Sequence, residues 1–425
     1  MVSTVKRVTL TNPFITTSLI AVLLFFPFTA LKLTMGKGKR WLFTSDGFYY
    51  YSYAVSLVLD KDVDFTNQYR FSRGVGNPKD REKIVPETGR PTNAVGIGCA
   101  LLWMPGFLLG HGLAKLAIRD GTPNGYELVY QVPTYFWSFL VGLFGLWLLY
   151  RLLEEMFTPK LALLTTVGIL FGTALSNYAF IHANMAHWTS AATAVAYLYA
   201  VYRLHQQPRS IALWIASGAL LGVSAMVRYQ NAALTLLLFG VVWELIRERA
   251  WKELLVGITS HVIATFVVFV PQMLAWKAIY GSWLTNPYGS YGARVIHFAQ
   301  EIPWNFSYLF WLFLWSPLLL LGIYGMTRPM PEVIPKLLVV GVALALLAQL
   351  HVNLSMPEIG GYGVRRMTDF FPYFGLGIAN ALRVLEQRWG SKASIGAIAA
   401  AVVYNWSMLA FFYLNQIHSD HFRFG

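Results

Sequence analysis

Long apolar stretches recur along almost the whole chain. Crossing a bilayer takes about 20 apolar residues in a helix, and a membrane β-barrel shows ten-residue segments of alternating hydrophobicity instead. The pattern therefore predicts an all-α polytopic membrane protein. Eleven stretches are predicted to span the membrane: 13–34, 131–150, 161–176, 187–204, 210–227, 231–246, 254–276, 304–326, 335–351, 367–385 and 393–413.

A twelfth stretch, 97–118, reads GIGCALLWMPGFLLGHGLAKLA and contains Pro105, Gly106 and His111. If it does not cross, the short loops on one side hold 14 lysines and arginines, and those on the other side hold 6. Short loops rich in Lys and Arg stay cytoplasmic, and a crossing here would reverse the bias. We therefore expect 97–118 to lie in the outer interface or to re-enter the membrane from outside.

This topology puts the N-terminus inside, the C-terminus outside, and a long first outer loop at 35–130. Further outer loops are expected at 277–303 and 352–366, within one transmembrane domain that covers 1–425. A loop as long as 35–130 is usually functional or disordered, and its aromatic and mixed-charge composition favours an ordered, functional segment. Lys6 and Arg7 precede the first apolar run as in a signal peptide, but no small-residue cleavage site follows, so we interpret the run as an uncleaved first span.

Composition supports the membrane assignment. The chain is 56% hydrophobic and 12% charged, whereas a soluble domain carries about 25% charged residues. The net charge of +13 comes largely from the loops, so we expect anionic membrane lipids as bulk partners and no nucleic acid. The single cysteine, Cys99, excludes an internal disulfide.

An acid stands at the start of the first outer loop. Asp46 follows the first span and precedes the aromatic stretch FYYYSYAVSLVL, which includes Tyr49 and Tyr50. One interpretation makes Asp46 the N-cap of a helix. The other makes it a general base facing a cavity at membrane level, with the tyrosines lining a sugar or lipid site.

Three arginines are predicted to lie on the same outer face. Arg228 sits in a short link between spans, where a charge near bilayer depth is costly and calls for an anionic partner. Arg365 and Arg366 follow the flexible IGGYG stretch, and paired guanidiniums suit phosphate. The alternatives are snorkelling to lipid headgroups for Arg228, and a headgroup anchor with a local Arg366–Asp369 pair for the other two.

Two further polar sets leave alternatives open. His182, Asn184 and His187 are expected in one outer loop, where a metal site lacks an evident third ligand and hydrogen bonding to a ligand or to the loop is the other interpretation. The run Asp60, Asp62 and Asp64 resembles part of a calcium loop but lacks its later glycine and glutamate, so we expect it to cap a short helix. The stretch NPYGSYGAR at 286–294 is expected to be a mobile loop that covers a ligand.

Several segments together resemble the membrane glycosyltransferases of the GT-C fold, in the bacterial branch related to protein O-mannosyltransferases and the aminoarabinose transferase that modifies lipid A. They are SDGFYYYSYAVSLVLDKDVDFTNQY, PTNAVGIGCALLWMPGFLLGHGLA, DGTPNGYELVYQ, SNYAFIHANMAHW, SAMVRYQNAAL, FLWSPLLLLGIYGM and GGYGVRRMTDFFPYFGLGIANAL. They occur in the family's order and cover most of the chain.

The resemblance implies a catalytic acid in the first outer loop, which matches Asp46, and interfacial helices before the second span. It also implies a polyprenyl-phosphate sugar donor, whose phosphate would be held by Arg228, Arg365 and Arg366. The acidic metal motif of some relatives is replaced here by IHANMAHW, so we expect a metal-free mechanism without a cofactor, with a divalent metal left open. Sugar or acceptor contacts are expected from Tyr49, Tyr50, Asn93, His182, Asn184, His187, Tyr229, Gln230 and Tyr362.

The expected function is transfer of a sugar, with inversion, to an acceptor hydroxyl of a lipid, glycan or protein. We expect an integral protein of the bacterial inner membrane with its site facing the exterior. The alternatives are a transporter or flippase for a lipid-linked substrate, which would place charges inside spans, and a glycan ligase or polymerase with a diphosphate-linked donor.

Overall fold

The computed structural model describes residues 13–35, 41–71, 83–118, 122–287, 306–354 and 361–418. These ranges are almost entirely helical, and the one β-bridge within them joins Ile84 to Pro91. The prediction of an all-α protein is therefore confirmed. The expected loop at 286–294 falls mostly outside the described residues, as do large parts of the predicted outer loops 277–303 and 352–366.

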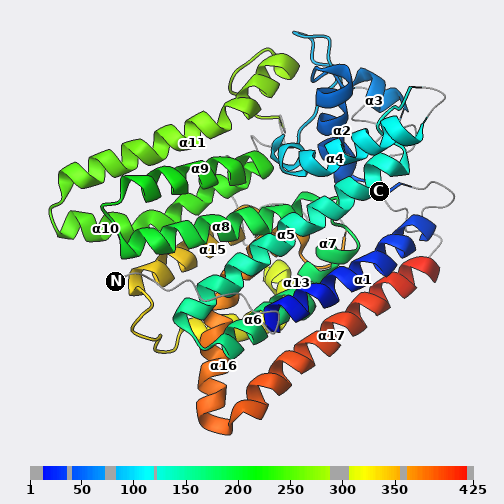
Figure 1. Ribbon diagram of the computed structural model, residues 1–425. Helices are drawn as coiled ribbons and strands as arrows, with labels where there is room; N and C mark the ends of the chain where they lie inside the picture. Colours follow the sequence, from blue (N-terminus) through cyan, green and yellow to red (C-terminus); the bar gives the residue numbers. More distant parts are fainter. Residues whose placement is uncertain are drawn as a thin grey trace.

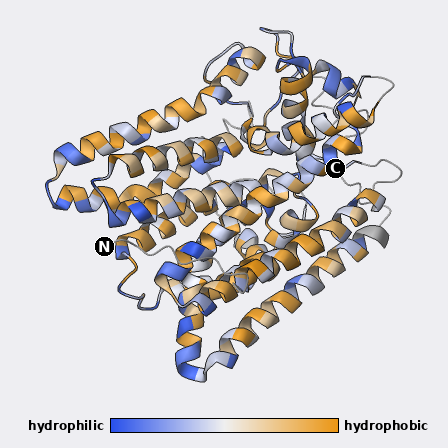
Figure 2. Cartoon of the chain, in the orientation of Figure 1, coloured by the Kyte–Doolittle hydropathy of each residue, from blue (hydrophilic) through white to orange (hydrophobic). Residues whose placement is uncertain are grey.

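Every predicted span coincides with helix over most of its described residues, and 161–176 runs past the end of α6 into a turn at 172–174. Eight stretches correspond to single helices: α1 (Pro13–Met35), α5 (Leu128–Met156), α6 (Pro159–Phe171), α8 (Ala186–Gln206), α9 (Ile211–Val227), α11 (Trp251–Tyr280), α15 (Lys336–Leu354) and α17 (Ser391–His418). By length and composition, the described part holds seven helices suited to cross a membrane, or up to eight if a bent pair counts as one. Figure 2 shows hydrophobic residues along these helices and hydrophilic ones gathered at many of their ends.

Three predicted spans change helix type or bend along their length, although Tyr229–Arg247 still counts as one helix suited to cross a membrane. The stretch 231–246 divides into η3 (Tyr229–Leu238) and α10 (Phe239–Arg247), and 367–385 divides into η5 (Arg365–Phe374) and α16 (Gly375–Trp389). The stretch 304–326 divides into α13 (Phe306–Trp315) and α14 (Leu318–Met326), bent by 105°. Pro317 stands at this bend, and proline removes a helix hydrogen bond and clashes with the preceding turn.

The segment predicted to be the first outer loop contains three helices in its described residues. It forms α2 (Asp46–Val55), α3 (Thr66–Phe71) and α4 (Gly98–Ala117), which gather at one end of the helical bundle (Figure 1). Aromatic rings join them: Phe48 stacks on Tyr126 at 6.2 Å between ring centroids, and Phe71 stacks on Tyr126 at 5.1 Å. Such contacts bury large apolar areas at favourable ring geometry, and the buried rings of this end belong to the same core as the rest of the bundle.

The ambiguous stretch 97–118 forms α4, which lies antiparallel to the first third of α5. Its Leu102 carbonyl accepts a hydrogen bond from the Trp137 indole at 3.1 Å. Further along α4, Gly110 comes so close to Tyr130 that an added Cβ would stand 2.7 Å from the Tyr130 Cα. α4 is also long and apolar enough to span a membrane, so its interfacial placement stays a prediction.

The strand-like segment after residue 83 is tied to the end of α11. The Arg90 guanidinium donates to the Ala278 carbonyl at 2.8 Å, and the Thr88 hydroxyl donates to the Ile279 carbonyl at 2.6 Å. The Tyr280 hydroxyl donates in turn to the Asn93 carbonyl at 2.9 Å. The segment predicted to be the first outer loop is therefore anchored on α11, far along the chain. The Arg90–Ala278 hydrogen bond joins residues 188 positions apart.

Candidate functional site

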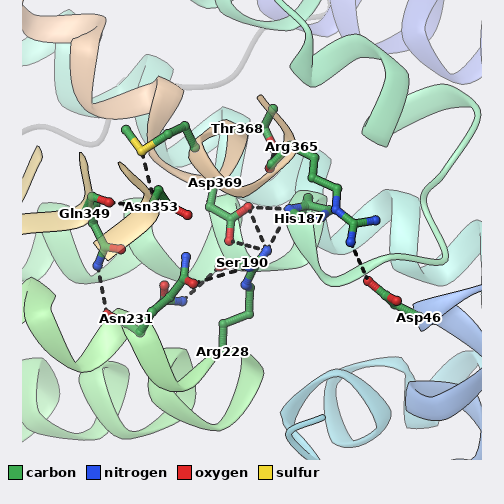
Figure 3. A network of polar contacts seen from close by, with 12 residues as sticks. Asp46, His187, Ser190, Arg228, Asn231, Gln349, Asn353, Arg365, Thr368 and Asp369 are labelled. Carbon is green, nitrogen blue, oxygen red and sulfur yellow. Dashed lines mark hydrogen bonds and ion pairs between the residues drawn. The ribbon is translucent and has the colours of Figure 1, made fainter. Parts of the chain in front are cut away.

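Asp46 and Arg365 lie together at the end of the bundle that carries α2. The Asp46 carboxylate, which is 45% exposed, stands 3.8 Å from the Arg365 guanidinium, which is 18% exposed. Asp46 is the first residue of α2 and Arg365 the first residue of η5. Figure 3 shows Arg365 reaching from η5 toward Asp46. The acid thus has an accessible face and a cation beside it.

The structure corrects the interpretation of Asp46 as a helix cap. Ser45 occupies the N-cap position of α2, and its side chain makes no capping hydrogen bond. Ser45 has φ 54°, an uncommon conformation for a residue other than glycine. The turn is closed by backbone bonds from Gly47 N to the Thr44 carbonyl and from Phe48 N to the Ser45 carbonyl, each 3.1 Å. The Asp46 carboxylate is therefore not used to start its own helix.

Gly47 is required by a close approach of Asn184. A Cβ at this position would stand 2.2 Å from Asn184 Nδ2 and 2.6 Å from the Asn184 carbonyl oxygen. We expect Gly47→Ala to lower the free energy of unfolding by about 1–3 kcal/mol, because overpacking forces a backbone shift. Gly112→Ala in α4 is the matched control, since a Cβ there meets nothing within 4 Å. Thermal unfolding of both variants tests this, and equal midpoints would contradict it.

Arg228 pairs with an acidic residue, as the sequence predicted, but the sequence did not identify which acid. Arg228 Nη1 lies 3.2 Å from Asp369 Oδ2, and the side chains are 15% and 0% exposed. His187 joins them, with Nδ1 2.7 Å from Asp369 Oδ1 and 2.7 Å from Arg228 Nη1 (Figure 3). The expected local pair of Asp369 with Arg366 is wrong, because Asp369 pairs with Arg228 and His187.

The shared His187 nitrogen has two exclusive roles. With a proton on Nδ1, the ring donates to the Asp369 carboxylate; without it, Nδ1 accepts from Arg228. Either arrangement leaves the buried carboxylate next to a guanidinium, and a buried charge needs such compensation. The cluster of Asp369, Arg228 and His187 therefore joins η5, the end of α9 and the first turn of α8.

Two of the three arginines each face a carboxylate. Arg228 is opposite Asp369 and Arg365 is opposite Asp46. For Arg366, the next residue in η5, no ion pair or hydrogen bond to another described side chain is present. Arginine binds phosphate oxygens through paired, charge-assisted bonds, so Arg365 and Arg366 are candidates for binding an anion.

Contrary to the prediction from the sequence, His182 and His187 do not lie in one loop. His187 lies in the first turn of α8 rather than in the loop after α7 (Leu175–Phe180). His182 does lie in the loop, and its Nε2 is 3.2 Å from the Tyr413 hydroxyl. Burial, together with the charge of Lys32, holds the pKa of His182 well below its ordinary value, so this ring is neutral at pH 7.

The described residues include no ligand set of the kind that holds metal ions in proteins. Among these residues, no group of three His, Cys, Asp or Glu side chains is placed to hold a metal ion. The expectation of a metal-free mechanism stays a prediction. The acidic run, by contrast, has the expected capping role: Asp64 accepts from the Thr66 backbone N at 2.9 Å at the start of α3, and Asp62 accepts from the Ser56 hydroxyl at 2.7 Å.

Several residues expected to contact sugar or acceptor are engaged within the protein. The Asn93 amide donates to the Tyr49 carbonyl at 3.1 Å, and the Tyr362 hydroxyl is 3.0 Å from Asn405 Oδ1. Tyr50 is 7% exposed, with its ring 6.0 Å from that of Trp103.

Two more stand beside Arg228. Gln230 accepts from the Arg228 guanidinium at 3.3 Å, and Tyr229 packs against Trp276 with ring centroids 5.3 Å apart. The substrate contacts of Asn93, Tyr362, Tyr49, Tyr50, Tyr229, Gln230, His182, Asn184 and His187 stay predictions.

The fold and the site define a polytopic helical membrane protein with an acid and an arginine cluster at one end of its bundle. ArnT from Cupriavidus metallidurans has a similar structure. Its apo form is 17% identical with a TM-score of 0.51, covering 91% of this chain and 64% of ArnT. Its form bound to undecaprenyl phosphate is 16% identical with a TM-score of 0.56, covering 92% and 64%. The GT-C fold expected from the motifs is therefore confirmed.

A family model agrees over part of the chain. The model described as dolichyl-phosphate-mannose-protein mannosyltransferase matches residues 129–276, from the start of α5 to near the end of α11. No curated protein matches the chain. The chain spans about 64% of the length of the ArnT structures it resembles. The likeness to this group of glycosyltransferases thus holds for the fold and for the matched region.

Proposed function

We propose that the protein is a membrane glycosyltransferase that moves a sugar from a polyprenyl-phosphate donor to an acceptor hydroxyl, with inversion at the anomeric carbon. The observation that carries the proposal is the exposed Asp46 carboxylate 3.8 Å from the Arg365 guanidinium. The ArnT structure with undecaprenyl phosphate has the same fold, and the matched family model describes a mannosyltransferase that uses dolichyl-phosphate-mannose.

Each part of the site has a role in the proposed reaction. Asp46 takes the proton of the acceptor hydroxyl, whose oxygen then attacks the anomeric carbon. The bond between that carbon and the phosphate oxygen breaks, and polyprenyl phosphate leaves with the bonding electrons. In the proposed reaction, Arg365 and Arg366 balance the charge that develops on the leaving phosphate, because fixed cations are most effective where charge develops. A positioned base typically contributes about 10²–10⁴-fold.

Arg228 differs from Arg365 because its ion-pair partner is fully buried. Its partner Asp369 is 0% exposed and compensates its charge, so Arg228 brings no unbalanced charge to the phosphate. The Arg228 side chain retains 15% exposure. We propose that it is a secondary phosphate ligand held in orientation by Asp369 and His187.

The surroundings of the reaction follow from the predicted topology. We propose an integral protein of the bacterial inner membrane with Asp46 on the external side, reached by the donor from the outer leaflet. The acceptor is a hydroxyl of a lipid, glycan or protein, and no metal takes part.

A donor panel tests the function directly. Purified protein in nanodiscs is incubated with undecaprenyl-phosphate and dolichyl-phosphate sugars carrying different hexoses and pentoses, with and without a chelator. We expect release or transfer of sugar from at least one of these donors, with polyprenyl phosphate as the second product, and no effect of the chelator. Turnover of diphosphate-linked donors alone would overturn the proposal.

A further inference from the structure

Lys32 lies buried in the last turn of α1, and the proposed reaction gives it no task. Its side chain is 9% exposed, and the ammonium stands 5.0 Å from the centroid of the Tyr135 ring. Burial of an ammonium is costly unless hydrogen bonds and charge compensate it, and an aromatic face supplies part of that compensation. Lys32 also has a hydrogen-bond acceptor, because its Nζ donates to Asn184 Oδ1 at 2.6 Å.

The lysine fixes the orientation of the Asn184 amide. Because Oδ1 faces the ammonium, Nδ2 must point the other way, and it donates to the Thr44 carbonyl at 2.8 Å. That carbonyl also accepts from Gly47 N at 3.1 Å, in the turn that leads into α2. Asn184 is 0% exposed, so its amide has no water with which to exchange these bonds.

The loop that carries Asn184 is itself held from α5. The Tyr135 hydroxyl donates to the Ile181 carbonyl at 2.7 Å, and the Ser138 hydroxyl donates to the Ala183 carbonyl at 2.9 Å. Tyr135 thus contacts both the lysine, through its ring, and the loop, through its hydroxyl. α1, α5 and the loop form one rigid support beneath the turn.

The supported turn contains Asp46. Thr44 accepts the Asn184 bond, Ser45 adopts its positive φ, and Gly47 fits against Asn184 where no side chain has room. A strained turn persists when the surrounding structure determines it. We propose that Lys32 is a positioning residue, which holds the Asn184 amide so that it clamps the turn of residues 44–47 and aims the Asp46 carboxylate. This inference rests on the proposed function for its catalytic consequence, but not for the clamp itself.

Two variants separate a clamp from a general effect on stability. Lys32→Met removes the ammonium and frees the amide to rotate. Asn184→Asp keeps an oxygen acceptor for Lys32, and adds a negative charge to it, but replaces the Nδ2 donor by an oxygen, so it loses the bond to Thr44. If Lys32 has a purely structural role, the protein should tolerate Asn184→Asp. If Lys32 acts through the clamp, the same substitution should release the turn. Lys160→Met is the matched control, because Lys160 pairs with Glu386 at 2.5 Å and lies at the start of α6.

Hydrogen exchange of residues 44–50 in nanodisc-embedded protein is the first readout, and donor kinetics are the second. We expect Lys32→Met and Asn184→Asp to exchange at least tenfold faster there than wild type, with kcat lowered 10- to 100-fold and KM for the donor unchanged. Lys160→Met should match wild type in both. Wild-type exchange in Lys32→Met and Asn184→Asp would overturn the inference, as would faster exchange with unchanged kcat. Faster exchange in a protein whose wild type transfers no sugar would support the clamp and refute the proposed function.

Discussion

Asp46→Asn is expected to abolish sugar transfer, with a rate lowered by about 10²–10⁴-fold, because an amide cannot accept the proton of the acceptor hydroxyl. The carboxylate is 45% exposed and makes no helix cap, so the substitution should leave folding almost unchanged. Initial rates with an active polyprenyl-phosphate donor measure the effect, and thermal unfolding checks the fold.

Asp60→Asn is the matched control for this substitution. Asp60 lies in the same outer segment, is exposed, and bonds only to nearby side chains such as Asn67 at 3.0 Å. Its variant should keep transfer within about threefold, since its carboxylate contacts only Asn67 and Gln68, and a surface substitution is typically worth at most about 0.5 kcal/mol. A folded Asp46→Asn protein with rates near those of wild type would refute Asp46 as the base.

Asp369→Asn is expected to lower the free energy of unfolding by about 3 kcal/mol, because it leaves Arg228 without a charge partner in a buried position. Asp369 is 0% exposed and contacts both Arg228, at 3.2 Å, and His187, at 2.7 Å. Thermal unfolding in detergent measures the loss. Donor binding should weaken as well, because the Arg228 guanidinium is no longer held in place.

The double variant Arg228→Met with Asp369→Leu distinguishes the two effects. Removing both charges leaves no uncompensated ion, so stability should return to near the wild-type value, as found when buried ion pairs are replaced by apolar residues. Donor binding should not return. A double variant as unstable as Asp369→Asn would contradict the account of this pair.

The sequence predicted the helices well because apolar length is a local signal. Each of the eleven predicted spans coincides with helix, and the aromatic segment after Asp46 forms α2 as a continuation of the same pattern. The 3₁₀ stretches η3 and η5 were missed, because both lie in stretches whose composition still resembles a span. Pro317 was a visible signal for the bend between α13 and α14.

The site was predictable only in part, because its pairs join distant residues. Arg228 and Asp369 lie 141 residues apart, and Lys32 and Asn184 lie 152 apart. Arg228 was predicted to need an anionic partner because it lies between two predicted spans. The sequence alone did not distinguish among several acidic residues as that partner. An acid followed by the apolar stretch FFPYF was the available signal for Asp369. Lys32 gave none, because a lysine at the end of a span usually reaches the headgroups.

The central claim is that Asp46 and the arginines form one site for a lipid phosphate. The most direct test is an experimental structure of the protein in nanodiscs with an undecaprenyl-phosphate sugar bound to the Asp46→Asn variant. The account predicts phosphate oxygens about 3 Å from the Arg365 guanidinium, with a second contact from Arg366 or Arg228 and the sugar facing residue 46. A phosphate bound at the opposite end of the bundle, away from α2 and η5, would contradict it.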